Sequence, residues 1–287
     1  MTMTLPMTLE EFTQDIDHLV SLPSVGVRVN AVVNDPNSTA DDIGKLISQD
    51  AALAARVLRI ANSPAYGLSS QITTIARAVS IVGTQLIRDL VLATSTISAF
   101  KDIPNELVSL ENFWDHSLYC GIAARLLAEQ RGMKHAETEF LAGLLHDIGQ
   151  LVIFRKQPEA TRRALLLSVE GPDDLALHKA EQAVFGFDHA QVGAELLRHW
   201  HFPPLLVACV AYHHAPQEAQ QFQIEVALVH IANSIASLAE IDSVAEDDAV
   251  RTEAAAWELL GLSKDVIEPT VRATQAQFAE MRGLLLG

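Results

Sequence analysis

The chain has little cysteine and no long apolar run, and each shortage excludes a class of protein. Only Cys120 and Cys209 occur among the 287 residues, and neither belongs to a C-x-x-C pair. A disulfide framework is therefore excluded, and a reduced, cytoplasmic setting is expected. No apolar run of about 18 residues is free of charge, so no transmembrane span is predicted. The first ten residues lack a basic segment followed by an apolar run, so no secretory signal is predicted either.

Basic residues are also scarce relative to acidic ones. The chain has 20 lysines and arginines against 36 aspartates and glutamates, which gives a net charge of −16. An acidic surface repels phosphate backbones and anionic lipid headgroups, so direct binding to nucleic acid or to a membrane is not expected. Hydrophobic residues make up 49% of the chain, which is enough for one large domain or two tightly joined lobes.

Hydrophobic residues recur at helical spacing along the whole chain, and no alternation typical of strands is sustained. Thr8 to Glu11 has the pattern of a capping box, and it predicts a first helix that ends before Pro23. Thr39 to Asp42 predicts the cap of a second helix. Further helices are predicted at 53–61, 72–82, 84–100, 107–131, 137–155, 158–169, 173–184, 188–200, 203–214, 221–239, 246–260 and 263–285. The predicted fold class is all-α.

A short segment with a proline divides this pattern into two parts. Asp102 to Asn105, with Pro104, is predicted to join an N-terminal helical lobe (1–105) to a second helical lobe (106–287). The sequence has no P-loop, no G-x-G-x-x-G and no G-x-S-x-G motif. Gly143, Gly149 and Gly193 are therefore interpreted as positions where helices pack closely.

Candidate functional residues gather in the second lobe. They are imidazoles, one carboxylate and one amide: His116, His146, Asp147, His189, His213, His214 and Asn233. Eleven histidines occur in the chain, and most of the others have the ordinary interpretation of hydrogen-bonded or surface residues.

His189 follows a strong helix start. Asp188 and Gln191 have the spacing of a capping box, which places His189 at the first helical position and fixes its direction. The cap does not need the imidazole. A charged imidazolium is disfavoured near a helix N-terminus, whereas the neutral form that binds metals is not.

His146 and Asp147 stand side by side in a strongly apolar segment. A buried carboxylate must be paired, because an isolated charge in the protein interior is costly, and a divalent cation is one such partner. Imidazole and carboxylate ligands together suit Mn, Fe, Zn, Co or Ni. On a continuous helix the two side chains would point about 100° apart, and could bind one metal from two sides or bridge two metals. The alternative is a hydrogen-bonded polar pair within the core.

The N-terminal half carries several strings that resemble one protein family. These are Asp35–Ser38, Ile47–Leu53, Arg56–Ser63 and Ile75–Gly83, followed in the second half by Glu181–Leu197 and Trp200–Pro203. They resemble the HDOD (HD-related output domain) family of bacterial signalling proteins, within the HD superfamily of metal-dependent phosphohydrolases. The resemblance spans about residues 16–240. It implies a second lobe built as an HD-type helical bundle.

The second half is also similar to the HD-GYP phosphodiesterases, which cleave cyclic di-GMP. By position, His116, His146, Asp147, His189, His213 and His214 match the metal ligands of that family. Three residues depart from it. Gln150 stands where a phosphate-contacting lysine is expected, Asn233 lies near the place of a final aspartate ligand, and Asn112 replaces a carboxylate. The Gly-Tyr-Pro signature is absent.

The resemblance therefore implies a signal-transduction output domain that is non-catalytic or weakly catalytic. Such a domain would act through contacts with receiver, kinase or diguanylate cyclase domains, and would bind one or two Fe, Mn, Zn or Ni ions or none. The alternative is a metal-dependent phosphohydrolase that acts on a nucleotide or cyclic dinucleotide. In that case His146 and Asp147 would be the catalytic residues, with a metal-bound water as the nucleophile.

Overall fold

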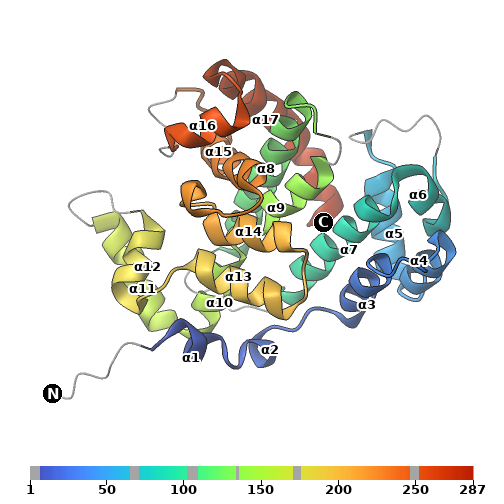
Figure 1. Ribbon diagram of the computed structural model, residues 1–287, viewed down its shortest axis with the longest axis horizontal. Helices are drawn as coiled ribbons and strands as arrows, with labels where there is room; N and C mark the ends of the chain where they lie inside the picture. Colours follow the sequence, from blue (N-terminus) through green and yellow to red (C-terminus); the bar gives the residue numbers. More distant parts are fainter. Residues whose placement is uncertain are drawn as a thin grey trace.

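The computed structural model describes residues 7–64, 71–101, 109–133, 136–170, 176–245 and 252–286. Within these ranges every regular element is helical and there is no strand (Figure 1). The predicted all-α fold class is therefore confirmed. None of the helices in these ranges is long and apolar enough to cross a membrane.

The N-terminal part contains short helices around one long one. They are α1 (Leu9–Thr13), α2 (Ile16–Leu19), α3 (Ser24–Val33), α4 (Ala40–Ile47), α5 (Ala51–Ala61), α6 (Ile75–Val82) and α7 (Thr84–Ala99). Thr8 and Thr39 cap α1 and α4 through the reciprocal bonds of a capping box, as predicted. The prediction of one helix from Thr8 to Pro23 is wrong, because the chain divides into α1 and α2.

Helix α3 was not predicted from the sequence. It contains five valines and Gly26, residues of low helix propensity. Packing against α7 overrides that propensity. A Cβ atom on Gly26 would lie 2.8 Å from Oγ of Ser95, so a larger residue would require the Ser95 side chain to shift.

Asn62, in the string Arg56–Ser63, closes a local connection. Its side-chain amide donates to the carbonyl oxygens of Leu58 and Ile72, both at 2.8 Å, and its Oδ1 accepts from the backbone N–H of Ile72 at 2.7 Å. One side chain thus fixes the end of α5 to the segment that leads into α6. The asparagine has a structural role there.

The second part is a bundle of longer helices. It comprises α8 (Leu110–Gln130), α9 (Ala136–Leu145), α10 (Ile148–Lys156), α11 (Pro158–Glu170), α12 (Leu177–Phe185), α13 (His189–His199), α14 (Pro204–Tyr212), α15 (Gln223–Glu240), α16 (Ala254–Leu260) and α17 (Ile267–Leu285). The predicted helix starts at 107, 173 and 246 lie outside the described residues.

The predicted helix 137–155 is two helices, and the break falls on the functional pair. Helix α9 ends at Leu145, and α10 begins at Ile148. The His146 ring donates from Nδ1 to the carbonyl oxygen of Gly143 at 2.7 Å, an oxygen that a continuing helix would use for its own backbone. The prediction that His146 and Asp147 lie on one continuous helix is therefore wrong.

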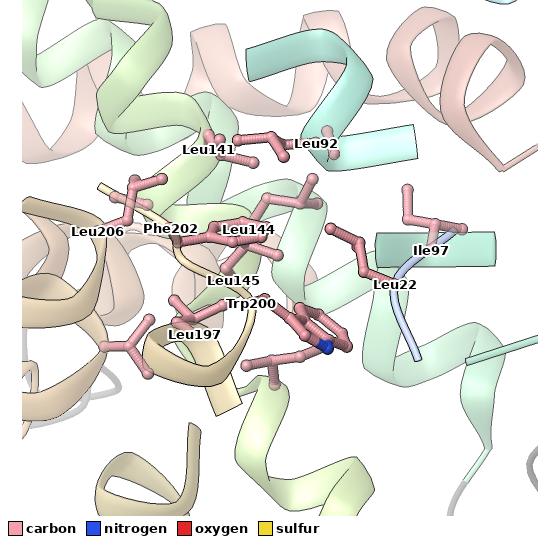
Figure 2. Packing of buried hydrophobic residues seen from close by; sticks show 14 of the residues in the cluster. Leu22, Leu92, Ile97, Leu141, Leu144, Leu145, Leu197, Trp200, Phe202 and Leu206 are labelled. Atoms are coloured by element: carbon pink, nitrogen blue, oxygen red, sulfur yellow. The ribbon is translucent and has the colours of Figure 1, made fainter. Parts of the chain in front are cut away.

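One hydrophobic cluster extends through both parts of the chain, from Phe12 to Leu285. Figure 2 shows the packing around Trp200, whose ring centroid lies 6.1 Å from that of Phe100, the residue that follows α7. The residues labelled there are buried and come from α7, α9, α13, α14 and adjoining segments: Leu22, Leu92, Ile97, Leu141, Leu144, Leu145, Leu197, Trp200, Phe202 and Leu206. The boundary at 102–105 lies outside the described residues, so the division into 1–105 and 106–287 stays a prediction.

The glycines predicted to allow close packing lie at helix crossings. A Cβ atom on Gly143 of α9 would lie 2.7 Å from the carbonyl oxygen of Cys120 in α8. A Cβ atom on Gly149 of α10 would lie 2.0 Å from the carbonyl oxygen of His189 in α13. These crossings bring the backbones that carry the candidate ligands together.

Charged residues are also buried where α7 meets α9. Asp89 accepts from Nε of Arg88 at 2.8 Å and from Oγ1 of Thr138 at 2.9 Å. The neighbouring Glu139 is 3% exposed, and its Oε2 has no hydrogen-bond partner among the described residues. Burial, together with the carboxylates of Glu225 and Asp89, raises the pKa of Glu139 to about 8.

Replacing Glu139 with glutamine is expected to remove a pH-dependent loss of stability. In the folded protein this carboxyl group holds its proton up to about pH 8, whereas the unfolded chain releases it near its ordinary pKa of 4.5. The unfolded state therefore binds fewer protons between these values, and stability falls as the pH rises through that window. The Glu139→Gln variant should be about 1–3 kcal/mol more stable than the wild type at pH 8.5 and nearly equal at pH 4.5 in urea unfolding.

Glu159 provides the matched control, because it is an exposed glutamate on α11. Glu159→Gln should leave the difference between the two pH values unchanged. An unchanged pH dependence in the Glu139→Gln variant would contradict the assignment of a proton to Glu139.

Candidate metal centre

Four segments bring six of the predicted residues together: α8, the break between α9 and α10, the start of α13 and the end of α14. Their ligand atoms form two groups, and in each group the atoms lie within 4.8 Å of one another. The first group is Asp147, His189, His213 and His214, and the second is His116, His146 and Asp147. Asp147 belongs to both groups. The arrangement has the shape of a site for one ion or for two ions that share a carboxylate.

Asp147 owes its position to the break between α9 and α10. It stands at the N-cap of α10, but its side chain makes no capping bond and faces the imidazoles. Its Oδ1 lies 3.0 Å from Nε2 of His189 and 3.4 Å from Nε2 of His213, and its Oδ2 lies 3.3 Å from Nε2 of His146. The carboxylate is thus at the centre of three imidazole nitrogens.

The three innermost imidazoles are oriented by hydrogen bonds from Nδ1. His146 donates to the carbonyl oxygen of Gly143 at 2.7 Å, and His213 donates to that of Val210 at 2.8 Å. His189 donates to Oε2 of Glu181 at 2.6 Å. With Nδ1 committed as a donor, each ring turns Nε2 toward Asp147. This is the outer-shell arrangement that orients histidine ligands in metal sites.

Glu181 fixes both the ring and the backbone of His189. Its Oε2 also accepts the backbone N–H of His189 at 2.9 Å, while Asp188 and Gln191 form the predicted capping box of α13. Glu181 is 2% exposed, and it was not predicted as a site residue. It lies four residues before Phe185, hence on the same buried face of α12. An acidic residue within an apolar stripe is the signal that could have identified it.

His214 extends the first group toward the surface. Its Nε2 lies 2.9 Å from Nε2 of His189, and its ring stacks on that of His178 with centroids 4.0 Å apart. His178 was not predicted as part of the site. Two imidazole nitrogens at this spacing are compatible with neighbouring positions around one metal, where bonds of about 2.1 Å at right angles place the donors about 3.0 Å apart.

His116 forms the more exposed edge of the second group. Its Nε2 lies 3.0 Å from Oδ1 of Asn233, and its Nδ1 lies 3.1 Å from Oε2 of Glu240. Asn233 and Glu240 lie seven residues apart on α15, so both reach the same side of the helix. Glu240 was not predicted from the sequence. The proposed role of Asn233 as a metal ligand stays a prediction.

Burial and neighbouring carboxylates shift the pKa values of these histidines in opposite directions. Burial alone would lower the pKa of His189, but the carboxylates of Glu181 and Asp147 outweigh it and raise the pKa to about 10. Asp147 likewise overcomes the effect of burial at His146 and raises its pKa well above the ordinary value. Burial lowers the pKa of His213 to about 4 and that of His214 far below its usual range. Burial thus acts on all four rings in the same direction, and the carboxylates beside His146 and His189 reverse the pKa shift at those two.

Unsatisfied polar atoms show that these residues fit a cation. Nε2 of His146, Nε2 of His213 and Oδ1 of Asp147 are buried and have no hydrogen-bond partner of good geometry in the described part of the chain. Buried polar atoms without a partner are rare and costly, and a divalent ion would satisfy all three. A donor set of several imidazoles and one carboxylate suits Fe, Mn, Zn or Ni. Such an ion would polarise a phosphate oxygen and activate a bound water molecule.

Replacing Glu181 with glutamine is expected to lower divalent-metal affinity about 10- to 100-fold. The amide no longer provides the negative charge that keeps the His189 ring oriented and strongly donating. Metal titration by isothermal calorimetry measures the change. Glu195→Gln, on the surface of α13, is the control and should bind metal as the wild type does. An unchanged affinity in the Glu181→Gln variant would show that the bond to His189 does not tune the site.

Comparison with protein families gives one match over most of the chain. A family model described as the HDOD domain matches residues 19–216. The chain also matches curated relatives that are much longer than itself: it spans 42% of the length of one and 18% of another.

Solved structures share the same architecture. An HDOD domain protein of Geobacter sulfurreducens superposes with a TM-score of 0.77 at 24% identity, with 97% of each chain covered. A candidate phosphohydrolase of Shewanella amazonensis SB2B gives 0.75 at 29% identity, with 96% of this chain and 97% of that one covered. A candidate signal transduction protein of Marinobacter aquaeolei VT8 gives 0.72 at 22% identity, covering all of this chain and 63% of its own.

Proposed function

Because the chain belongs to the HDOD family, we propose that it is a bacterial signal-transduction output domain that holds one divalent metal ion and turns over little or no substrate. It would act in the cytoplasm through contacts with receiver, kinase or diguanylate cyclase domains. The observation that carries the proposal is the composition of the centre. Six residues converge, but only one of them, Asp147, is a carboxylate.

Charge favours a single ion at this centre. Asp147 supplies one negative charge to the ligand groups, whereas Glu181 and Glu240 lie behind histidines. A second divalent ion near the first would meet strong repulsion with no further carboxylate to offset it. The buried group of Asp147, His189, His213 and His214 offers the first ion more ligands than the more exposed group around His116.

The surroundings also offer little help to a phosphodiester. Gln150, in the first turn of α10, has no charge, and its backbone N–H donates to the carbonyl oxygen of Asp147 at 2.9 Å. Asn112, one turn before His116 on α8, is exposed and uncharged. Phosphoryl transfer needs positively charged groups beside the phosphate oxygens, because negative charge on those oxygens must be stabilised. Neither residue provides such a group.

A metal-dependent phosphohydrolase is the second candidate. The observation that favours it is that the two ligand groups share Asp147, which is the form of a site with a bridging carboxylate. The Shewanella relative is also named as a candidate phosphohydrolase. In this case His146 and Asp147 would hold the ion and the attacking water, and the substrate would be a nucleotide or a cyclic dinucleotide.

Hydrolysis assays on metal-loaded protein distinguish the two candidates. Protein purified without a histidine tag would be loaded with Mn²⁺ or Fe²⁺ and incubated with cyclic di-GMP, other cyclic dinucleotides and nucleoside phosphates. The output-domain proposal expects one bound ion and no turnover above metal-free protein. Two bound ions with turnover that Asp147→Asn abolishes and Asp41→Asn preserves would establish the phosphohydrolase instead.

A further inference from the structure

An open surface cavity is lined in part by α14, and none of its lining residues is a candidate metal ligand. It has a volume of about 450 Å³, within the range of small-molecule pockets. Its lining residues come from α13, α14 and the segment before α15: Arg198, Phe202, Pro204, Val207, Ala208, Tyr212, Gln220, Gln221 and Phe222. Leu206, Cys209 and Val210 of α14 are buried in the core, so one side of the helix holds the fold and another lines the cavity.

The lining combines aromatic walls with a few polar groups. Phe202, Tyr212 and Phe222 provide flat apolar surfaces. Gln220 and Gln221 provide amide donors and acceptors, and Arg198 provides the only positive charge of the lining. Arg198 forms an ion pair with Glu195 on the same exposed helix face, and exposed pairs of this type contribute little to stability. A guanidinium group has five N–H donors, so Arg198 can also donate to a ligand. A ligand with a flat apolar ring and an acidic group would complement the aromatic side chains and Arg198.

Two residues in the left-handed conformation lie at or beside the cavity lining. Phe222 lines it with a φ of 55°, and His201, beside Phe202, has a φ of 56°. Residues other than glycine adopt this conformation rarely and at an energetic cost. The turn at His201 is also tied to the N-terminal part of the chain, because Nδ2 of Asn30 donates to its carbonyl oxygen at 2.7 Å.

The cavity and the metal centre share one helix. Tyr212, the last residue of α14, lines the cavity, and the next two residues are the candidate ligands His213 and His214. A ligand that changes the packing of α14 therefore changes the position from which both imidazoles extend. By linkage, metal binding would change the affinity for the ligand by the same factor.

We propose that this cavity is an effector site for a small, flat aromatic acid, and that its occupancy alters metal affinity through α14. The second clause rests on the metal site proposed above, whereas the first does not. The ligand would be the signal that this domain converts into a change at its metal centre.

Fluorescence titration with 8-anilinonaphthalene-1-sulfonate tests the cavity in metal-free protein. This probe is an aromatic acid of suitable size, and one saturable site is expected. Ala208→Trp fills the cavity and should abolish binding, and Arg198→Met should weaken it about tenfold. The exposed residues Ala255 and Arg162 provide the matched controls Ala255→Trp and Arg162→Met, which should bind as the wild type does.

Mn²⁺ titrations with and without saturating probe test the coupling. A change in Mn²⁺ affinity of about threefold or more is expected, and Ala208→Trp should remove it. Probe binding that survives both Ala208→Trp and Arg198→Met in folded variants would overturn the effector site. Probe binding with unchanged Mn²⁺ affinity would overturn the coupling. If the protein binds no Mn²⁺ at all, the proposed function fails and the coupling with it, while the titration in metal-free protein still decides the cavity.

Discussion

Replacing Asp147 with asparagine is expected to lower divalent-metal affinity at least about 100-fold. Loss of an outer-shell residue lowers metal affinity about 10- to 100-fold, and loss of a direct ligand lowers it further. Asp147 contributes to both ligand groups and is their only carboxylate. Asparagine preserves the shape of the side chain but removes the charge that attracts the cation. Isothermal calorimetry with Mn²⁺ or Zn²⁺ measures the change, alongside circular dichroism to confirm the fold.

Asp41→Asn, on the exposed first turn of α4, removes the same charge far from the centre in sequence and should leave metal affinity unchanged. Equal loss in both variants would mean that net charge governs binding and that Asp147 is not a ligand. Full affinity in the Asp147→Asn variant would contradict the shared-carboxylate site outright.

Replacing Gly149 with alanine is expected to destabilise the fold by about 3 kcal/mol and to abolish metal binding. The new Cβ would lie 2.0 Å from the carbonyl oxygen of His189 and 2.5 Å from the backbone nitrogen of Gly193. Both obstacles are backbone, so α10 and α13 must move apart. That movement separates Asp147, two residues before Gly149, from His189. Urea unfolding and metal titration measure the two effects.

Gly283→Ala is the matched control on α17, where an added Cβ meets no atom within 4 Å. It should stabilise the protein by about 0.5–1 kcal/mol, because alanine is the better helix former. A Gly149→Ala variant as stable as this control would show that the crossing of α10 and α13 is looser than described.

The positions of His189, His213 and His214 relative to helix ends could be predicted, because helix caps and apolar periodicity are visible in the local sequence. Asp188 and Gln191 mark the start of α13, so His189 was placed correctly at its first position. His213 and His214 were correctly placed at the end of an apolar helix. Local capping and hydrophobic periodicity suffice for such predictions.

The errors concern features that depend on tertiary contacts. The hydrophobic pattern runs unbroken through His146 and Asp147, so it could not reveal that a side chain competes with the backbone and divides α9 from α10. Glu181 and Glu240 contact histidines 8 and 124 residues away in sequence, and no local rule joins them. Helix α3 was not predicted because valine has a low helix propensity. The helix forms because it packs against α7.

Glu181 and Glu240 also refine the view of the centre as poor in carboxylates. Acidic residues are present, but they contact the imidazoles of His189 and His116 from outside the two ligand groups. They would strengthen these histidines as metal ligands without adding negative charge where a second cation would lie. This arrangement is consistent with one firmly held ion and little hydrolysis.

X-ray absorption spectroscopy at the metal edge tests the central claim most directly. Untagged protein would be exposed to Mn²⁺, Fe²⁺, Zn²⁺ or Ni²⁺, dialysed, and measured for bound metal and for the nitrogen ligands around it. One ion per chain is predicted, coordinated by at least two imidazole nitrogens, with the signal lost in Asp147→Asn. Protein that retains none of these ions, or an ion whose surroundings lack imidazole, would contradict a metal site at Asp147 and its histidines.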